Sequence, residues 1–328
     1  MRLSRVLSAS LFLAMVIGTT SCGKYSDRPK GVTSTSGVTK LACDASFRNI
    51  MEQEIQVFEY IYPDADVLPY YEDEKACFDS LMNLSVPSIV VTRELNEQEV
   101  KYLNSHKKKP KTSRIAVDAI ALIVNKQNDV GVLSTDEIAE ILEGKVTDWN
   151  EISPSKMGKI EVVFDHEGSS TVKYMRDSLT HGEKFGDNVF AQGSNEAVFE
   201  AVKNRKGAIG IIGVSWLSAN LDGKEATTAE ELAKASEESD TVALSFNPEV
   251  NVLKVRRSNS IESYKPYQQY IYEGKYPLYR SIYMITTGVG GTTSNGFYSF
   301  VTSVRGQKLI LMTGILPGTV YPRMVNLE

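Results

Sequence analysis

Segments typical of β-strands alternate with segments typical of helices through the first part of this 328-residue chain. Short apolar runs at residues 39–42, 67–71 and 88–91 read as strands, and the stretch at 77–84 reads as a helix. The segment after the first run has apolar residues at roughly helical spacing: Ile50, Ile55, Phe58 and Ile61. This alternation predicts an α/β fold with a mainly parallel sheet flanked by helices on both faces. Ligands bind such sheets beyond the carboxyl ends of the strands.

A second strand region at residues 115–125 is expected to carry the chain into another lobe. Ser134 and Glu137 then form a capping box before a helix that Gly144 ends. The acidic, polar stretch at 225–240 is expected to be a surface excursion. The remaining predicted elements are strands at 160–164, 208–212 and 281–286, and helices at 195–206 and 297–312.

The N-terminus has the pattern of a signal peptide at residues 1–21. Arg2 and Arg5 precede an apolar run of about thirteen residues, shorter than the ~20 residues that a bilayer-spanning helix needs. The small residues before Cys22 resemble the lipobox of bacterial lipoproteins, which implies acylation of Cys22; an ordinary signal peptide cleaved elsewhere is the alternative. We therefore expect an exported, membrane-anchored lipoprotein facing the periplasm or cell exterior, with a flexible tether at residues 22–37 rich in Ser, Thr and Gly.

The net charge limits the classes of molecule that this chain is expected to bind. Loss of residues 1–21 removes two arginines and no acidic residue, so the formal net charge falls from −5 to −7. An acidic chain of this kind is not expected to bind nucleic acid.

Two cysteines, Cys43 and Cys77, are left in the folded part. They could pair in an oxidising compartment or lie buried as separate apolar residues.

The stretch at residues 162–179 reads as a strand, a loop and the first turns of a helix. Its loop contains a glycine and three hydroxyl residues, Gly168, Ser169, Ser170 and Thr171. Unpaired backbone N–H groups and the positive end of the helix dipole converge at a helix N-terminus, and hydroxyls add further donors. The pattern therefore predicts a site for an anion such as phosphate, sulfate or a carboxylate, although a capped helix without a ligand gives the same pattern.

Catalytic and metal-binding patterns are not found in the sequence. The three histidines, His106, His166 and His181, lie in polar loops without metal-ligand spacing, and there is no Gly-x-Ser-x-Gly or His-Glu-x-x-His motif. His166 could act as a base for Ser169, but a third group to orient the histidine is not evident. We expect no enzyme activity, no cofactor and no metal.

Several segments together resemble the phosphate-binding proteins of phosphate ABC transporters (PstS-like), which are two-lobed periplasmic binding proteins of type II. In the family's order the chain contains AVDAIALIVN, LSTDEIAEILEGKVTDWNEI, EGSST and GAIGIIGVSWL, followed by GKYPLYRSIYMI and FVTSVRGQKLILMTGILP. The resemblance extends over residues 38–320. It implies a ligand cleft between lobe 1, at residues 38–115 and 252–328, and lobe 2, at residues 116–251.

The resemblance also implies ligand residues. Ser46 and Phe47 match a hydroxyl residue and Phe after the first strand, and residues 168–171 match the family's Gly-Ser-Gly-Thr loop with Ser170 in place of a glycine. Thr92 and Arg93 match Ser/Thr-Arg after the third strand of some members, so Arg93 is the expected charge partner. The alternative is that Arg93 pairs with Glu94 or Glu97 as an edge residue.

Two positions depart from the family. Asp165 stands where the family commonly has Arg, and an acidic loop at residues 72–75 replaces a loop rich in glycine and serine. A carboxylate ~4 Å from a phosphate repels it by roughly 1 kcal/mol per phosphate charge even in water. Asp165, Glu167, Asp73 and Glu74 therefore cannot all point into an anion site.

Two functions agree with these patterns. The first is a solute-binding lipoprotein that captures a small oxyanion, above all phosphate, between two lobes and delivers it to the permease of an ABC transporter. The alternative is a diverged binding-protein fold that serves as a sensor or a component of an envelope complex, with its anion specificity lost or altered.

Overall fold

The computed structural model describes residues 31–217, 228–238 and 246–319. The described residues from Val32 onward belong to one compact unit. The predicted signal peptide at 1–21, Cys22 and most of the tether at 22–37 lie outside the described residues. Within the described part, no helix is both long and apolar enough to cross a membrane.

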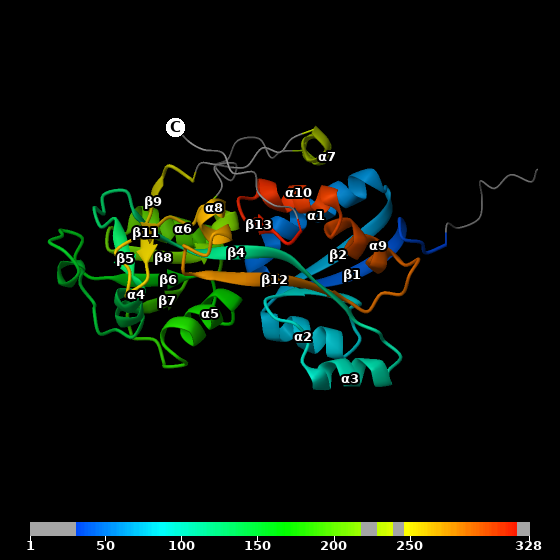
Figure 1. Ribbon diagram of the computed structural model, residues 1–328, viewed down its shortest axis with the longest axis horizontal. Helices are drawn as coiled ribbons and strands as arrows, with labels where there is room; N and C mark the ends of the chain where they lie inside the picture. The colour runs from blue at the N-terminus through cyan, green and yellow to red at the C-terminus, as the bar shows by residue number, and fades with distance from the viewer. Residues whose placement is uncertain (1–30, 218–227, 239–245, 320–328) are drawn as a thin grey trace, which may run out of the picture. The chain divides into compact units, whose positions relative to one another are not determined.

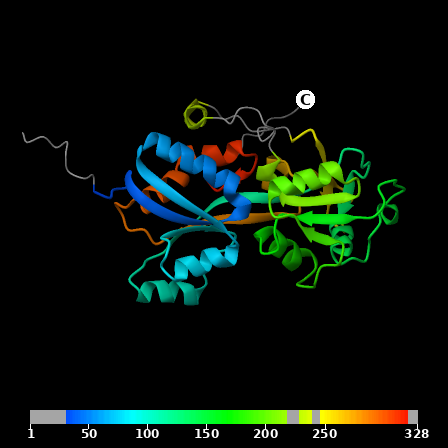
Figure 2. The ribbon, with the colours of Figure 1, turned by 180° about the vertical axis from the view of Figure 1, so that it is seen from behind.

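One half of the main sheet, called here the first half, has the strand order β2-β1-β3-β12. Its strands are β1 (Ser36–Asp44), β2 (Asp64–Glu72), β3 (Ser88–Val91) and β12 (Tyr279–Thr286). The first three are parallel and β12 is antiparallel to β3. Helices α1 (Arg48–Ile61), α9 (Thr293–Val301) and α10 (Val304–Met312) lie on one side of this sheet, and α2 (Glu74–Met82) and α3 (Glu97–Ser105) lie on the other (Figures 1 and 2).

The fifteen-residue strand β4 (Lys111–Asn125) joins the two halves. Its residues up to Ala119 pair with β12, and from Ile120 onward they pair with β8 (Ala208–Gly213). The short strand β13 (Leu316–Pro317) also pairs with its first part. Because β4 changes partner between Ala119 and Ile120, Asp118 lies at the junction of the two halves.

The second half consists of the end of β4, β8, β6 (Glu161–Phe164), β7 (Val189–Ala191) and β9 (Val250–Val252). Strand β6 is parallel to β7 and β8. Helices α5 (Ser170–Leu179) and α6 (Asn195–Asn204) lie on opposite sides of these strands (Figures 1 and 2). The predicted capping box is confirmed, since the Ser134 side chain accepts from the Glu137 N–H at the start of α4 (Thr135–Leu142).

Smaller elements complete the described part. Strands β5 (Val132–Ser134), β10 (Lys254–Arg256) and β11 (Ser263–Tyr264) form a separate three-stranded sheet. The others are α8 (Gln268–Tyr272) and the 3₁₀ turns η1 (Ala45–Phe47), η2 (Trp149–Glu151) and η3 (Val214–Trp216). Strand β10 pairs with β5 on one side and with β11 on the other, so residues just after the lobe boundary predicted at residue 252 pair with a strand from the predicted lobe 2.

Three details differ from the sequence-based expectations. The polar stretch at 225–240 contains a helix, α7 (Ala229–Glu238), which buries Leu232 and Ala233 although most of its residues are polar. The single final helix predicted at 297–312 is two helices, because Ser303 caps a new helix with its side chain. Helix α3 was not predicted. The α/β fold is confirmed, and each half of the sheet contains parallel strands, but β4 and β12 run antiparallel to their neighbours, so the sheet as a whole is mixed rather than mainly parallel.

Candidate functional site

The loop between β6 and α5 has the predicted form. Strand β6 ends at Phe164, and Ser169 is the N-cap of α5, with its Oγ accepting from the Val172 N–H at 3.2 Å. Ser169, Ser170 and Thr171 are all at least 98% buried. The strand, hydroxyl loop and helix N-terminus expected from the sequence are therefore confirmed, and the three hydroxyls lie inside the molecule.

Arg280 of β12 provides a buried positive charge at this helix N-terminus. Its Nη1 donates to Ser170 Oγ at 2.6 Å, and its Nη2 donates to Asp118 Oδ2 at 3.3 Å. Its guanidinium lies over the ring of Phe47, 4.7 Å from the centroid. The residue is 5% exposed, and its Nε has no hydrogen-bond partner among the described residues. Arg280 thus joins residues of three elements at the junction of the halves.

Arg280 belongs to the GKYPLYRSIYMI segment, and Asp118 to the strand AVDAIALIVN, but neither is among the residues predicted for the site. Each is a charged residue inside a strand that is otherwise largely apolar, and buried charges are paired. Two opposite charges in such strands were the signal that could have indicated the pair.

Ser46 and Phe47 reach the same place from the end of β1. The Ser46 hydroxyl donates to Asp165 Oδ2 at 3.4 Å, and the Ser46 carbonyl accepts from Trp216 Nε1 at 2.8 Å. Phe47 is fully buried. The structure therefore brings the predicted residues Ser46 and Phe47 together with the loop at 168–171.

Thr92 and Arg93 have partners within the first half. The N–H of Thr92 donates to Glu74 Oε1 at 2.6 Å, and its hydroxyl donates to the same oxygen. Arg93 forms a bidentate pair with Glu99 at 2.8 and 2.9 Å, and its guanidinium lies 3.6 Å from the centroid of the Phe78 ring. In the described part of the chain, no hydrogen bond or ion pair joins either residue to the loop at 168–171. The Arg93 partner is thus Glu99, and not the Glu94 or Glu97 carboxylate considered from the sequence.

Three carboxylates surround the junction: Asp44, Asp118 and Asp165, each at most 1% exposed. Burial raises the pKa of Asp44 and of Asp118, and the positive charge of Arg280 opposes that rise in both. Burial would also raise the pKa of Asp165, but hydrogen bonding with His166 and Ser169 holds it below its usual value. Oδ2 of Asp44 and Oδ1 of Asp165 are buried without a hydrogen-bond partner in the described structure.

The arrangement offers donors to an anion: the first N–H groups of α5, the neighbouring hydroxyls and the guanidinium of Arg280. Within the described ranges, no cluster of three or more His, Cys, Asp or Glu residues is arranged to hold a metal ion. The sequence left open whether Cys43 and Cys77 form a disulfide. In the structure both are buried and neither is part of a disulfide.

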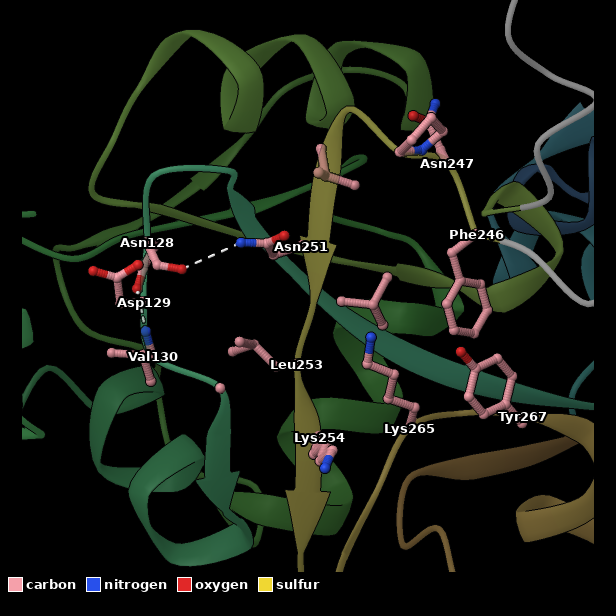
Figure 3. Close-up of a pocket in the computed structure, with 14 residues that line it drawn as sticks. Asn128, Asp129, Val130, Phe246, Asn247, Asn251, Leu253, Lys254, Lys265 and Tyr267 are labelled. Atoms are coloured by element: carbon pink, nitrogen blue, oxygen red, sulfur yellow. Dashed lines mark hydrogen bonds between the residues drawn. The ribbon is translucent and has the colours of Figure 1, made fainter. Parts of the chain in front are cut away.

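A separate pocket of about 670 Å³ opens beside β9 and β10 (Figure 3). The Phe246 and Tyr267 rings stack at one end of it, with their centroids 4.8 Å apart. Lys265, Asn251 and Asp129 also line it. It contains none of the residues predicted for the anion site and is therefore distinct from the junction.

Comparison with known proteins connects this geometry to one family. A family model described as a PBP superfamily domain matches residues 29–305. A phosphate-binding protein, PstS 2, from Streptococcus agalactiae is 30% identical over 119 residues, which are 36% of this chain and 39% of that protein, so the match spans well under two thirds of the relative. The phosphate-binding protein PstS of Bacillus subtilis is 23% identical over 324 residues, covering 96% of this chain and 92% of that protein.

Solved structures have the same fold. A Clostridium perfringens structure, assigned as a phosphate ABC transporter substrate-binding protein with bound phosphate, gives a TM-score of 0.66 at 20% identity, covering 86% of this chain and 99% of that one. An ABC-type phosphate transport receptor from Vibrio cholerae gives a TM-score of 0.60 at 17% identity, covering 85% and 99%. The predicted two-lobed fold of periplasmic binding proteins is confirmed by these likenesses.

Proposed function

Because this chain belongs to the PBP superfamily, we propose that it is an extracytoplasmic solute-binding lipoprotein that captures a small oxyanion, phosphate first of all, and delivers it to the permease of an ABC transporter. The protein binds and releases its ligand without catalysis. Relatives of this chain are named as phosphate-binding proteins, and a structure with the same fold contains phosphate. The anion lies between the two halves of the sheet, and capture is a hinge motion that brings them together.

One observation carries the proposal: the buried guanidinium of Arg280 faces the N-terminus of α5, with Ser170 hydrogen-bonded between them. A planar guanidinium can bind two oxygens of a phosphate, while the helix N-terminus supplies N–H donors. The ligand contacts that we propose are those predicted around the loop, namely Ser46, Phe47, Gly168, Ser169, Ser170 and Thr171.

Arg280 replaces Arg93 as the charge partner in this proposal. Thr92 and Arg93 would reach an anion at the loop only by leaving Glu74 and Glu99, whose carboxylates already bind them. Arg280 also has a carboxylate partner, Asp118, but it already contacts Ser170 of the loop, and its Nε has no hydrogen-bond partner in the described structure. Thr92 and Arg93 are therefore second candidates, which could contact the ligand only after a rearrangement within the first half.

Calorimetric titration with inorganic phosphate tests the function. We expect heat of binding and a rise in melting temperature for the wild type; no heat and no thermal shift at millimolar phosphate would rule out phosphate as the ligand. A parallel titration with sulfate tests whether another oxyanion is bound.

A Ser170→Ala variant is expected to bind phosphate about 10- to 100-fold more weakly. The variant loses a hydroxyl donor to a charged ligand, and such hydrogen bonds contribute about 1.5–3 kcal/mol. The exposed Ser105 of α3 provides the matched control, and Ser105→Ala should bind as the wild type does. Equal affinity of Ser170→Ala and wild type would place the anion elsewhere.

Attachment to the membrane is proposed from the N-terminal pattern. Acylation of Cys22 would hold the protein at the outer face of a membrane by its lipid, as the small residues before Cys22 indicate. We expect Cys22→Ala to remove incorporation of labelled palmitate and to move the protein into the soluble fraction. Unchanged labelling of that variant would show that Cys22 is not the acylated residue.

The buried carboxylates favour a second candidate, a binding-protein fold used in sensing or in an envelope complex. Asp165 stands in the anion loop, and Asp44 lies close by. Neighbouring genes discriminate between the two functions: adjacent permease and ATPase genes support transport, and their absence supports the second candidate.

A further inference from the structure

Two loops from different halves of the sheet meet beside the proposed anion site. His166, in the loop between β6 and α5, places its Nε2 2.9 Å from Oδ1 of Asp73, in the loop between β2 and α2. Its Nδ1 lies 3.4 Å from Oδ2 of Asp165. Asp73 also packs against Gly168, where a Cβ atom would overlap its carboxylate. The imidazole thus has a carboxylate at each nitrogen, one of them from the opposite half.

We propose that His166 is a latch between the two halves: in its protonated form it holds Asp73 of the first half to Asp165 of the second, so that the closed form and oxyanion capture depend on pH. His166 is a positioning residue here and not a ligand contact. The proposal rests on the proposed function for its ligand readout, but closure can be measured without a ligand.

The chemistry of imidazole supports this role. A neutral imidazole has one N–H and can donate to one carboxylate only, whereas imidazolium donates from both nitrogens. The charged groups that face His166 are Asp165 in its own loop, Asp73 in the β2–α2 loop and Asp44 at the end of β1. All three are acidic, so each favours the protonated form.

The direction of the pH effect follows from the pKa. The hydrogen bond with Asp165, followed by the charges of Asp165 and Asp73, raises the pKa of His166 above its ordinary value of 6.5. A raised pKa in the closed form means that the latch is fully present below pH 6.5 and is lost as pH rises through the raised pKa. Closure should therefore weaken on the alkaline side of neutrality.

Two other contacts between the halves involve no titratable group. Trp216 Nε1 donates to the Ser46 carbonyl at 2.8 Å, and Asn49 Nδ2 donates to the Ser215 carbonyl at 2.7 Å. All three histidines lie in the described part of the chain, and of these three only His166 lies within ion-pair distance of a carboxylate. The side chains of His166 and Asp73 are 25% and 49% exposed, so protons reach them without unfolding.

Trp216 gives a readout of closure that needs no ligand. The chain has two tryptophans, and a Trp149→Phe background leaves Trp216, at the junction, as the single tryptophan, whose emission is excited selectively. In this background we expect its emission to change with pH in one transition above pH 6.5. The transition should be absent in His166→Gln and in Asp73→Asn. It should persist in the control His106→Gln, because His106 is an exposed residue at the C-terminus of α3. A transition that survives both latch variants would overturn the proposal.

Phosphate affinity gives the second readout. Phosphate itself titrates near neutral pH, so the informative quantity is the ratio of the variant Kd to the wild-type Kd at each pH. For His166→Gln we expect a ratio above one at pH 6 that approaches one at pH 9, because the contacts of the imidazolium are present at pH 6 and are lost as it deprotonates. A ratio that does not change with pH would contradict the latch.

The two readouts separate the proposals. If Trp216 reports a His166-dependent transition but phosphate does not bind at any pH, the latch stands and phosphate as the ligand is rejected. If phosphate binds with a constant ratio and Trp216 shows no transition, the function stands and the latch is rejected.

Discussion

An Arg280→Met variant is expected to lose phosphate binding and about 3–5 kcal/mol of its free energy of unfolding. Removal of one member of a buried ion pair leaves the other charge without a partner in a medium of low polarity. Asp118 is fully buried and would keep the backbone N–H groups of Val214, at 3.1 Å, and Ser215 as donors, but no positive charge. The loss of binding has a separate cause, because the guanidinium is the positive side chain that contacts the α5 N-terminus.

A second substitution distinguishes these two effects. In Arg280→Met with Asp118→Asn, the amide keeps an acceptor for Val214 without a buried negative charge, so most of the stability should return while phosphate binding stays absent. Urea denaturation and calorimetric titration measure the two quantities. Phosphate binding by Arg280→Met at wild-type affinity would show that the charge partner is another residue, with Arg93 the next candidate.

A Phe47→Ala variant is expected to lose about 3–5 kcal/mol of its free energy of unfolding. Large-to-small substitutions of fully buried aromatic residues remove apolar contacts and leave a cavity. The ring of Phe47 has no exposed surface, and it lies between the core and the guanidinium of Arg280. Urea denaturation is the measurement, and a loss below about 1 kcal/mol would show that the core closes over the missing ring.

Two further variants define the origin of that loss. Phe190 of β7 is 44% exposed, so Phe190→Ala should change stability by about 0.5 kcal/mol or less. Phe47→Leu keeps much of the apolar volume but has no aromatic face for Arg280, and it should lose about 1–2 kcal/mol. If Phe47→Leu is as stable as the wild type, the contact between the guanidinium and the ring contributes nothing.

The acidic residues near the site illustrate how the tertiary structure settles a conflict seen in the sequence. Repulsion required that Asp165, Glu167, Asp73 and Glu74 should not all face an anion. Three of them have other partners: Asp73 and Asp165 lie against His166, and Glu74 accepts from Thr92. The fourth, Glu167, is exposed. These contacts agree with the electrostatic argument from the sequence, which stays a prediction.

Local patterns in the sequence predicted the fold class of this protein and the starts of two of its helices. Alternating strands and helices predicted the α/β class, the capping box at Ser134 predicted the start of α4, and the hydroxyl loop predicted the N-terminus of α5. These features depend on residues close together in the chain, since hydrogen bonds at a helix start join neighbours. Helix α7 was not predicted, because most of its residues are polar and only a few apolar ones pack against the core.

Only the tertiary structure decided which charge faces the hydroxyl loop. Arg93 matched a family motif, but it pairs with Glu99, six residues further along the chain, and lies over the ring of Phe78 on the preceding helix α2. Arg280 lies 110 residues from Ser170 and 162 from Asp118, and β12 and β4 bring the three together by pairing across the sheet. The sequence predicted the hydroxyl loop at the start of α5, but not the buried pair of Arg280 and Asp118. Their meeting depends on strand pairing over long distances in the chain, which no local pattern encodes.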